Sequence, residues 1–273
     1  MDPADGEKSH RVQELAPLEG MTDEEFAELA STVMVVIPYR QSEGISVGIC
    51  QHFGMWGRIG LRLATLKDPF GGFIEMTRGG IVKMFLDFCQ SHPKVKYLVM
   101  IDSDETIAWD APLRLAQHGL PIITGVVCGY SPERGIFACF CAKDENGVPR
   151  FPSFADTKML PAAGVAEVEI CGTGLLCVRR DVLETMVDAD EEPFFIPEEH
   201  RRESVRQGNL RKGEDIVFCE RAKRFGFKRY VDFSVHAGHY KNIQIGWPTD
   251  QIDPDLEAID WKPSKFDYRG VID

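Results

Sequence analysis

The stretch Tyr97-Leu98-Val99-Met100-Ile101-Asp102-Ser103-Asp104 determines how we interpret this chain. Its first five residues are apolar, which is typical of a strand buried on both faces of a central parallel sheet. Two carboxylates at the end of such a strand need a compensating charge. Hard divalent cations such as Mn²⁺ or Mg²⁺ prefer carboxylate oxygens, and open α/β sheets bind ligands at the carboxyl ends of their strands. Solvated Asp pairs are common in loops, so the buried strand before this pair is what favours a metal site.

Apolar runs and amphipathic segments alternate on both sides of this stretch. Continuous apolar runs at residues 33–37 and 121–127 predict two further buried strands. Helices are predicted over five segments: residues 22–30, opened by a capping box, and residues 78–91, 110–118, 180–187 and 214–225. This alternation predicts an α/β domain with a mainly parallel sheet.

Two parts of the chain follow other patterns. The glycine-rich segment 44–72 is hard to interpret beyond a helix at residues 58–66. In the second half, Asn146-Gly147 lies between short apolar runs and predicts a hairpin turn. Short strands are predicted at residues 167–171 and 229–232.

Composition limits the class of protein. The net charge of −12 argues against nucleic acid as the main partner, because phosphate contacts usually require a basic face. No apolar run reaches the roughly 18 residues of a membrane span, and the polar N-terminus lacks a secretory pattern, so we expect a cytoplasmic protein. The eight cysteines form no C-x-x-C pair and are expected to be reduced, mostly buried thiols rather than zinc ligands.

Three further motifs carry chemically useful side chains. Glu214 and Asp215 begin a predicted helix, so they are either ordinary N-terminal charges or a general base and its support. His236 and His239 follow a predicted strand and are either structural or metal ligands. Gly172-Thr173-Gly174 is either a tight turn or a place where a sugar approaches the backbone.

Six segments in chain order resemble the GT-A fold glycosyltransferases, with the closest likeness to the family 2 type found in phage and bacteria. They are Val33 to Pro38, Thr77-Arg78 before an apolar helix, Leu98 to Asp104, Gly172 to Asp181, Gly213 to Ala222 and Tyr230 to His239. The resemblance covers roughly residues 32–241. Segment 44–72 does not align with the family's usual nucleotide-binding segment.

The resemblance implies a mixed, mainly parallel Rossmann-like sheet flanked by helices, with a nucleotide-binding and an acceptor-binding half. It implies an arm and short helix at residues 1–31, a catalytic domain at 32–241 and a tail or lid at 242–273, which includes Trp247. Asp102, Asp104 and His239 would hold Mn²⁺ or Mg²⁺, with Asp215 as the base and Glu214 as its support. The donor, with a UDP-sugar favoured, would be contacted by these residues: Pro38, Tyr39, Arg40, Arg78, Asp102, Ser103, Gly172, Thr173, Gly174 and Lys241.

The implied reaction moves a sugar from a nucleoside-diphosphate sugar to an acceptor hydroxyl with inversion. The acceptor is open: a glycan, a protein, a lipid or a modified nucleic-acid base. Retention is one alternative. A nucleotidyltransferase is another, although Pro38-Tyr39-Arg40 lacks the expected Gly-rich basic loop. A carbohydrate-binding or nucleotide-sugar-binding module would not need both Asp215 and the Asp-x-Asp pair.

Overall fold

A computed structural model of the chain describes residues 18, 20–40, 44–68, 73–131, 135–143, 149–152, 164–199 and 213–240. The expected arm up to residue 17, the Asn146-Gly147 turn, Lys241 and the tail with Trp247 lie outside the described residues. The division into segments 1–31, 32–241 and 242–273 remains a prediction.

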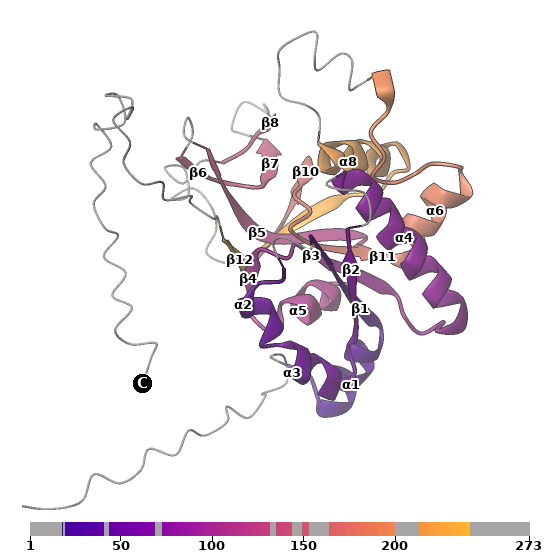
Figure 1. The fold of residues 1–273 in the computed structure, drawn as a ribbon, viewed down its shortest axis with the longest axis vertical. Coiled ribbons are helices and arrows are strands. Elements are labelled where there is room, and N and C mark those ends of the chain that lie inside the picture. Colours follow the sequence, from indigo (N-terminus) through magenta and orange to yellow (C-terminus); the bar gives the residue numbers. More distant parts are fainter. Residues whose placement is uncertain are drawn as a thin grey trace, which may run out of the picture. The chain divides into compact units, whose positions relative to one another are not determined.

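The centre of the fold is an open sheet with strand order β2-β1-β3-β11-β5-β12-β4 (Figure 1). Its strands are β1 (Val33–Tyr39), β2 (Arg62–Lys67), β3 (Tyr97–Ile101), β4 (Glu105–Ile107), β5 (Ile122–Ser131), β11 (Leu175–Arg179) and β12 (Arg229–His239). Strands β2, β1 and β3 run parallel, as do β5 and β12, whereas β11 and β4 are antiparallel to their neighbours. The predicted α/β class with a mixed, mainly parallel sheet is confirmed.

Short strands extend this sheet and form a smaller one. β6 (Gly135–Ala138) pairs with β5, and β9 (Val165–Val168) pairs with β12. β7 (Phe140–Lys143) pairs with both β8 (Pro149–Arg150) and β10 (Ile170–Cys171) in the second sheet.

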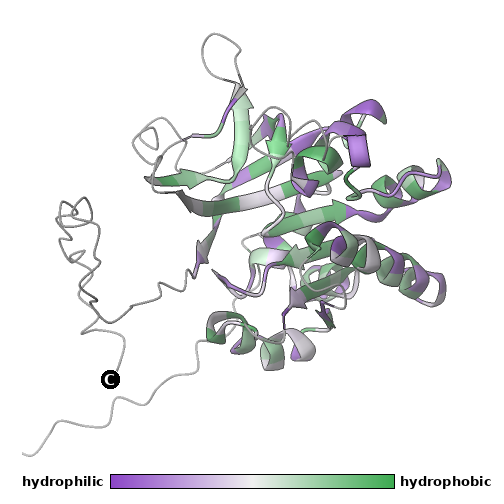
Figure 2. Ribbon diagram, turned by 45° about the horizontal axis from the view of Figure 1, so that its top comes forward, coloured by the Kyte–Doolittle hydropathy of each residue, from purple (hydrophilic) through white to green (hydrophobic). Residues whose placement is uncertain are grey.

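Helices cover both faces of the central sheet. They are α1 (Asp23–Ser31), α2 (Val47–Cys50), α3 (Phe53–Arg58), α4 (Ile74–Ser91), α5 (Ala111–Gln117), α6 (Arg180–Asp188) and α8 (Glu214–Arg224). Val33, Val35 and Ile37 of β1 pack in one core with α1, α2, α3 and α5. Met34 and Val36 point to the other face and pack with α4, α6 and α8. Because both faces are covered, the central strands are mostly apolar, and the sheet in Figure 2 is largely green.

The helix predicted at residues 58–66 is wrong. Helix α3 ends at Arg58, Gly60 adopts a left-handed φ of 85°, and the chain then enters strand β2. β2 pairs in parallel with β1 along six residues at the edge of the sheet. This pairing overrides the helix propensity of a segment that contains Leu, Ala and Lys, since tertiary context outweighs local preference.

The directions of the strands bring distant segments to one edge of the sheet. The parallel strands β1, β2 and β3 end at this edge, and the antiparallel strand β11 begins there, with Leu175 opposite Ile101. The backbone amide of Asp102 donates a hydrogen bond to the carbonyl of Gly174 at 2.9 Å. β12 ends there as well, with His239 opposite Glu105 at the start of β4.

Among the described residues, no helix combines the length and apolar character that a membrane crossing requires. All eight cysteines are free thiols, and five of them are buried.

A carboxylate holds the irregular part of β12 that precedes His239. The pairing of β12 with β5 shifts register between Asp232 and His236. Within this bulge, Asp232 Oδ1 accepts hydrogen bonds from the amide and hydroxyl of Ser234, and its Oδ2 lies 2.8 Å from His118 Nε2. Burial raises the pKa of Asp232, but the bonds from His118 and Ser234 outweigh it and hold the pKa below its usual value.

We expect Asp232→Asn to lower the free energy of unfolding by about 1–3 kcal/mol at pH 7, because a charged hydrogen-bond acceptor is lost. Since the folded-state pKa is depressed, this contribution is present above the unfolded pKa of about 3.9 and disappears as the pH falls through the folded value. Urea unfolding at pH 7, 5, 4 and 3 measures it. Asp87→Asn, in the exposed Lys83–Asp87 pair, is the control and should change little. A loss that is the same at every pH would contradict this account.

Candidate active site

A buried arginine joins four segments at the carboxyl edge of the sheet. Arg78, in the first turns of α4, is 1% exposed. Its Nη2 donates to both carboxylate oxygens of Asp102 at 2.9 and 3.2 Å, and its Nε donates to Glu214 Oε1 at 3.1 Å. Its Nη1 donates to the carbonyl of Thr173 at 3.4 Å, while the Thr173 hydroxyl donates to the same Glu214 oxygen. One guanidinium thus connects α4, the end of β3, the Gly172–Gly174 loop and the start of α8.

The two aspartates of the Asp-x-Asp pair have different partners. A tight turn follows β3, in which the amide of Glu105 donates to the carbonyl of Asp102 at 3.1 Å. Asp102 binds Arg78, whereas Asp104 Oδ2 lies 2.8 Å from His239 Nε2. The turn therefore directs Asp102 toward α4 and α8 and Asp104 toward the end of β12.

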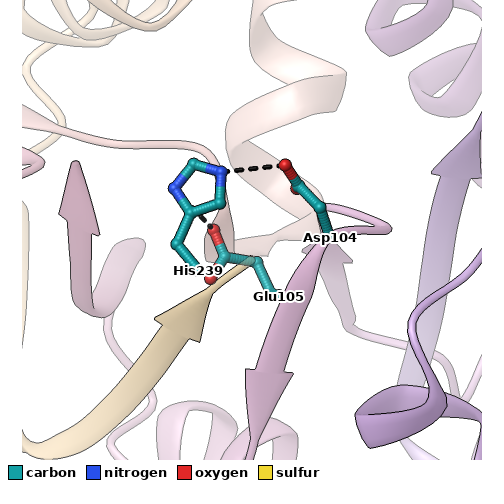
Figure 3. A group of neighbouring side chains, drawn as sticks. All are labelled: Asp104, Glu105 and His239. Atoms are coloured by element: carbon teal, nitrogen blue, oxygen red, sulfur yellow. Dashed lines mark hydrogen bonds and ion pairs between the residues drawn. The ribbon is translucent and has the colours of Figure 1, made fainter. Parts of the chain in front are cut away.

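Asp104, Glu105 and His239 form the group that could hold a metal ion. One ligand atom from each lies within 4.8 Å of the others. Figure 3 shows both carboxylates directed at the His239 ring from the start of β4. Glu105 is 1% exposed, and its Oε1 lies 4.0 Å from His239 Nδ1. The sequence pattern pointed to Asp104 and His239 but did not single out Glu105, although it directly follows the Asp-x-Asp pair.

The hydrogen bonds of His239 determine which nitrogen faces the carboxylate. Its Nδ1 lies 3.0 Å from the carbonyl of Cys128, which can only accept, so Nδ1 carries a proton. In the neutral ring the lone pair of Nε2 then points at Asp104. Two acceptors that face each other require a proton or a metal cation between them. This donor set suits Mn²⁺ or Mg²⁺, and imidazole favours Mn²⁺ of the two.

The charges around this edge favour a cation. The hydrogen bond with Asp104 raises the pKa of His239, and Glu105 adds to the shift. Burial raises the pKa of Asp102, and the carboxylates of Asp104 and Glu214 add to that effect while Arg78 opposes it. A bound divalent cation would relieve this repulsion among the carboxylates.

Asp215 lies at the first turn of α8. Its Oδ1 accepts from the amide of Ile216 at 2.8 Å. Burial raises the pKa of Asp215 above its usual value, and Glu214 adds to the shift. A side chain on Gly213 would place its Cβ 2.4 Å from Asp215 Oδ1, so glycine is needed at the N-cap for this carboxylate position. Its raised pKa makes Asp215 a stronger proton acceptor than an ordinary surface aspartate.

Glycine is required at residues 172 and 174 for different reasons. A Cβ on Gly172 would lie 2.4 Å from the carbonyl oxygen of Cys139, which is backbone packing. A Cβ on Gly174 would lie 2.8 Å from Glu105 Oε1, at the candidate metal group. The hydroxyl of buried Thr124 donates to the carbonyl of Leu175 at 2.8 Å and lies 3.2 Å from the carbonyl of Gly172, so it packs against both ends of the loop.

The other predicted donor-binding residues lie around the ends of β1 and β3. Pro38 is buried in β1, Tyr39 is half-buried at its end and Arg40 is exposed. The carbonyl of Ser103 accepts from the amide of Ser46 at 2.8 Å, so the chain before α2 is fixed to the Asp-x-Asp turn.

One polar contact near β1 was not expected from the sequence. Asp68, directly after β2, accepts a hydrogen bond from the Thr77 hydroxyl at 2.8 Å. The residue pattern of segment 44–72 does not predict this contact, because it does not identify β2 as a strand.

Comparison with known proteins gives structural likeness at low sequence identity. No protein-family profile and no curated protein sequence matches the chain. Among solved structures, A197 from STIV is 18% identical, with 77% of this chain and 86% of that chain covered and a TM-score of 0.48. GalNAc-T7, crystallised with UDP, GalNAc and Mn²⁺, is 12% identical, with 79% and 45% covered and a TM-score of 0.42. A putative glucose-1-phosphate thymidylyltransferase from Bacillus anthracis is 13% identical, with 73% and 70% covered and a TM-score of 0.34. We therefore base the function on the side chains of the site.

The two glycines of the loop should respond differently to alanine. Gly174→Ala would push the Glu105 carboxylate out of the candidate metal group, so we expect Mn²⁺ affinity to fall about tenfold, or about 1.4 kcal/mol. Gly172→Ala meets rigid backbone and should instead lower the free energy of unfolding by about 1–3 kcal/mol. Calorimetric Mn²⁺ titration and urea unfolding of both variants separate these effects. Equal Mn²⁺ affinity in wild type and Gly174→Ala would exclude Glu105 from the metal group.

Proposed function

We propose that this chain is a metal-dependent glycosyltransferase of the GT-A type, which transfers a sugar from a nucleoside-diphosphate sugar to an acceptor hydroxyl with inversion. The observation that supports it best is that a group of possible metal ligands and a candidate proton acceptor lie at one edge of the sheet. Asp104, Glu105 and His239 offer oxygen and imidazole ligands to a cation. Asp215 offers a proton acceptor from the start of α8.

The divalent ion would be held by Asp104, Glu105 and His239. When bound, Mn²⁺ or Mg²⁺ supplies Lewis-acid stabilisation of the negative charge on a leaving diphosphate. His239 suits this role because the carbonyl of Cys128 fixes its ring and leaves Nε2 toward the ligand group. The net acidity of the site also explains why a cation is needed before a diphosphate can enter.

The other residues of the site would contact either the sugar donor or the acceptor molecule. The carboxyl ends of β1 and β2, with Tyr39, Arg40 and Asp68, are the natural place for the nucleoside in an open α/β sheet. The sugar would bind at the Thr173–Gly174 backbone, which contacts Asp102 after β3 and Arg78, while the Thr173 hydroxyl contacts Glu214 of α8. Lys241 is proposed as a further donor contact. A UDP-sugar is the donor that we would test first.

Asp215 is proposed as the base that accepts the proton of the acceptor hydroxyl. Its raised pKa strengthens it as a proton acceptor, and the first turn of α8 fixes its position. Glu214 is held by Arg78 and Thr173, which fits a supporting role at the boundary of the sugar and acceptor sites.

The first test concerns the metal and the nucleotide. Nucleoside diphosphate should stabilise the protein far more with Mn²⁺ than with EDTA, by about 2.7 kcal/mol at 100 times Kd. Asp104→Asn and His239→Ala should remove this difference, and the exposed Asp87→Asn should keep it. A thermal-shift panel of nucleoside di- and triphosphates and nucleotide-sugars measures the effect. Equal stabilisation with and without metal in the wild type would contradict the proposal, and a strict preference for triphosphates would favour a nucleotidyltransferase.

The second test concerns Asp215. Asp215→Asn should bind Mn²⁺ and nucleotide-sugar with near-normal affinity but transfer about 10²–10⁴-fold more slowly, because the variant keeps the shape and loses the base. Glu220→Gln, on the exposed face of the same helix, is the control and should transfer at the wild-type rate. The product anomer, measured by NMR coupling constants, should be inverted. Retained configuration, or wild-type transfer by Asp215→Asn, would exclude an inverting base at this position.

A further inference from the structure

Arg78 has a charge environment that differs from that of a surface or substrate-binding arginine. Its side chain is 2% exposed, so it is not open to an incoming diphosphate in this structure. Burial by itself would lower its pKa, but the carboxylates of Asp102 and Glu214 outweigh that effect and raise it. The guanidinium therefore stays charged and occupies the space that these two carboxylates share.

The contacts of Arg78 with three groups depend on the planar shape of its guanidinium. Nη2 contacts both oxygens of Asp102, Nε contacts Glu214, and Nη1 contacts the Thr173 carbonyl. A lysine ammonium is a point charge and could not reach three groups in these directions at once. Asp102 and Glu214 are 112 positions apart in sequence (214 minus 102), and no hydrogen bond or ion pair between them occurs among the described contacts.

We propose that Arg78 is a positioning residue that serves as a permanent internal counter-cation. It keeps Asp102 and Glu214 engaged, and so confines the divalent ion to Asp104, Glu105 and His239. This inference rests on the proposed function only in taking a divalent ion as the resident cofactor. In this inference Asp102 is not a metal ligand. Its role is to bind Arg78, and this contact helps to fix the shape of the site.

Because Arg78 binds both carboxylates, Asp102 and Glu214 depend on the same cation. Without Arg78, the carboxylates of Asp102 and Glu214, whose side chains are 31% and 14% exposed, would have no cation between them, and such a partly buried uncompensated pair is unfavourable. A divalent cation from solution is the simplest replacement. The inference therefore predicts that a protein without Arg78 binds a divalent cation at Asp102 and Glu214. Loss of packing alone would not produce this binding.

The experiment measures Mn²⁺ affinity and stoichiometry by calorimetry in wild type, Asp102→Asn, Asp104→Asn, Arg78→Ala and the double variants Arg78→Ala/Asp102→Asn and Arg78→Ala/Glu214→Gln. With Arg78 present, Asp102→Asn should change Mn²⁺ affinity by less than about threefold, since only a paired charge is altered. Asp104→Asn should weaken it by about 10–100-fold, as expected for a ligand. Arg78→Ala should gain Mn²⁺ binding that either second substitution abolishes.

Arg78→Lys keeps the test decisive if Arg78→Ala folds poorly, because it keeps a cation and should show only part of the gain. In a folded Arg78→Ala protein, added guanidinium ions should suppress the new Mn²⁺ binding. Arg221→Met is the matched control. Arg221 is also buried, but it binds Glu191 and the carbonyls of Pro193 and Phe195 away from the site. This variant should lower stability without any gain in Mn²⁺ binding.

The outcomes separate the two proposals. An Asp102→Asn variant that loses Mn²⁺ as strongly as Asp104→Asn would overturn the role of Arg78, because Asp102 would then be a ligand. So would an Arg78→Ala protein that loses stability like Arg221→Met and gains no cation. If the wild type binds no Mn²⁺ while Arg78→Ala gains it through Asp102 and Glu214, the proposed function fails and Arg78 stands only as the counter-cation of these two carboxylates.

Discussion

The site depends on the direction of β11 and β4, which run opposite to the five other strands of the path β2-β1-β3-β11-β5-β12-β4. Parallel strands deliver only their carboxyl ends to the ligand-binding edge, but an antiparallel strand delivers its beginning. β11 therefore starts beside the end of β3 and places Gly174 against Asp102. β4 starts beside the end of β12 and places Glu105 against His239. Without these two reversals, the Gly172–Gly174 loop and Glu105 would not reach the edge at which β3 and β12 end.

Charge compensation is the second constraint on this edge. Asp102, Asp104, Glu105, Glu214 and Asp215 gather there, while Arg78 is the buried cation among their described partners. The turn after β3 divides the carboxylates into a group that binds Arg78 and a group that faces His239. The single charge of Arg78 partly compensates Asp102 and Glu214, whereas the group that faces His239 needs a proton or a metal. The turn thus separates the carboxylate that binds Arg78 from the carboxylate that faces His239 over only three residues of chain.

The sequence predicts an element correctly where its residue pattern fits only one type of secondary structure. Continuous apolar runs predicted β1 and β3, amphipathic spacing predicted α4 and α8, and Thr22 with Glu25 predicted the capping box that the structure contains. The pattern failed at β2, where the residues tolerate either state and only pairing with β1 decides. The partners of Arg78 could not be predicted, because its contact with Glu214 spans 136 positions and depends on how α4 and α8 pack.

The glycines show why a motif alone does not identify its chemistry. Gly172 and Gly174 look equivalent in sequence, and both suit a loop that approaches a sugar. In the structure one is constrained by the Cys139 backbone and the other by the Glu105 carboxylate. Glu105 is itself too buried to be expected from a polar turn, yet the missing side chain at residue 174 is what gives its carboxylate room. The acidic turn and the glycine loop are therefore one structural unit: β11 provides space, β4 provides the carboxylate, and β12 provides the histidine that faces it.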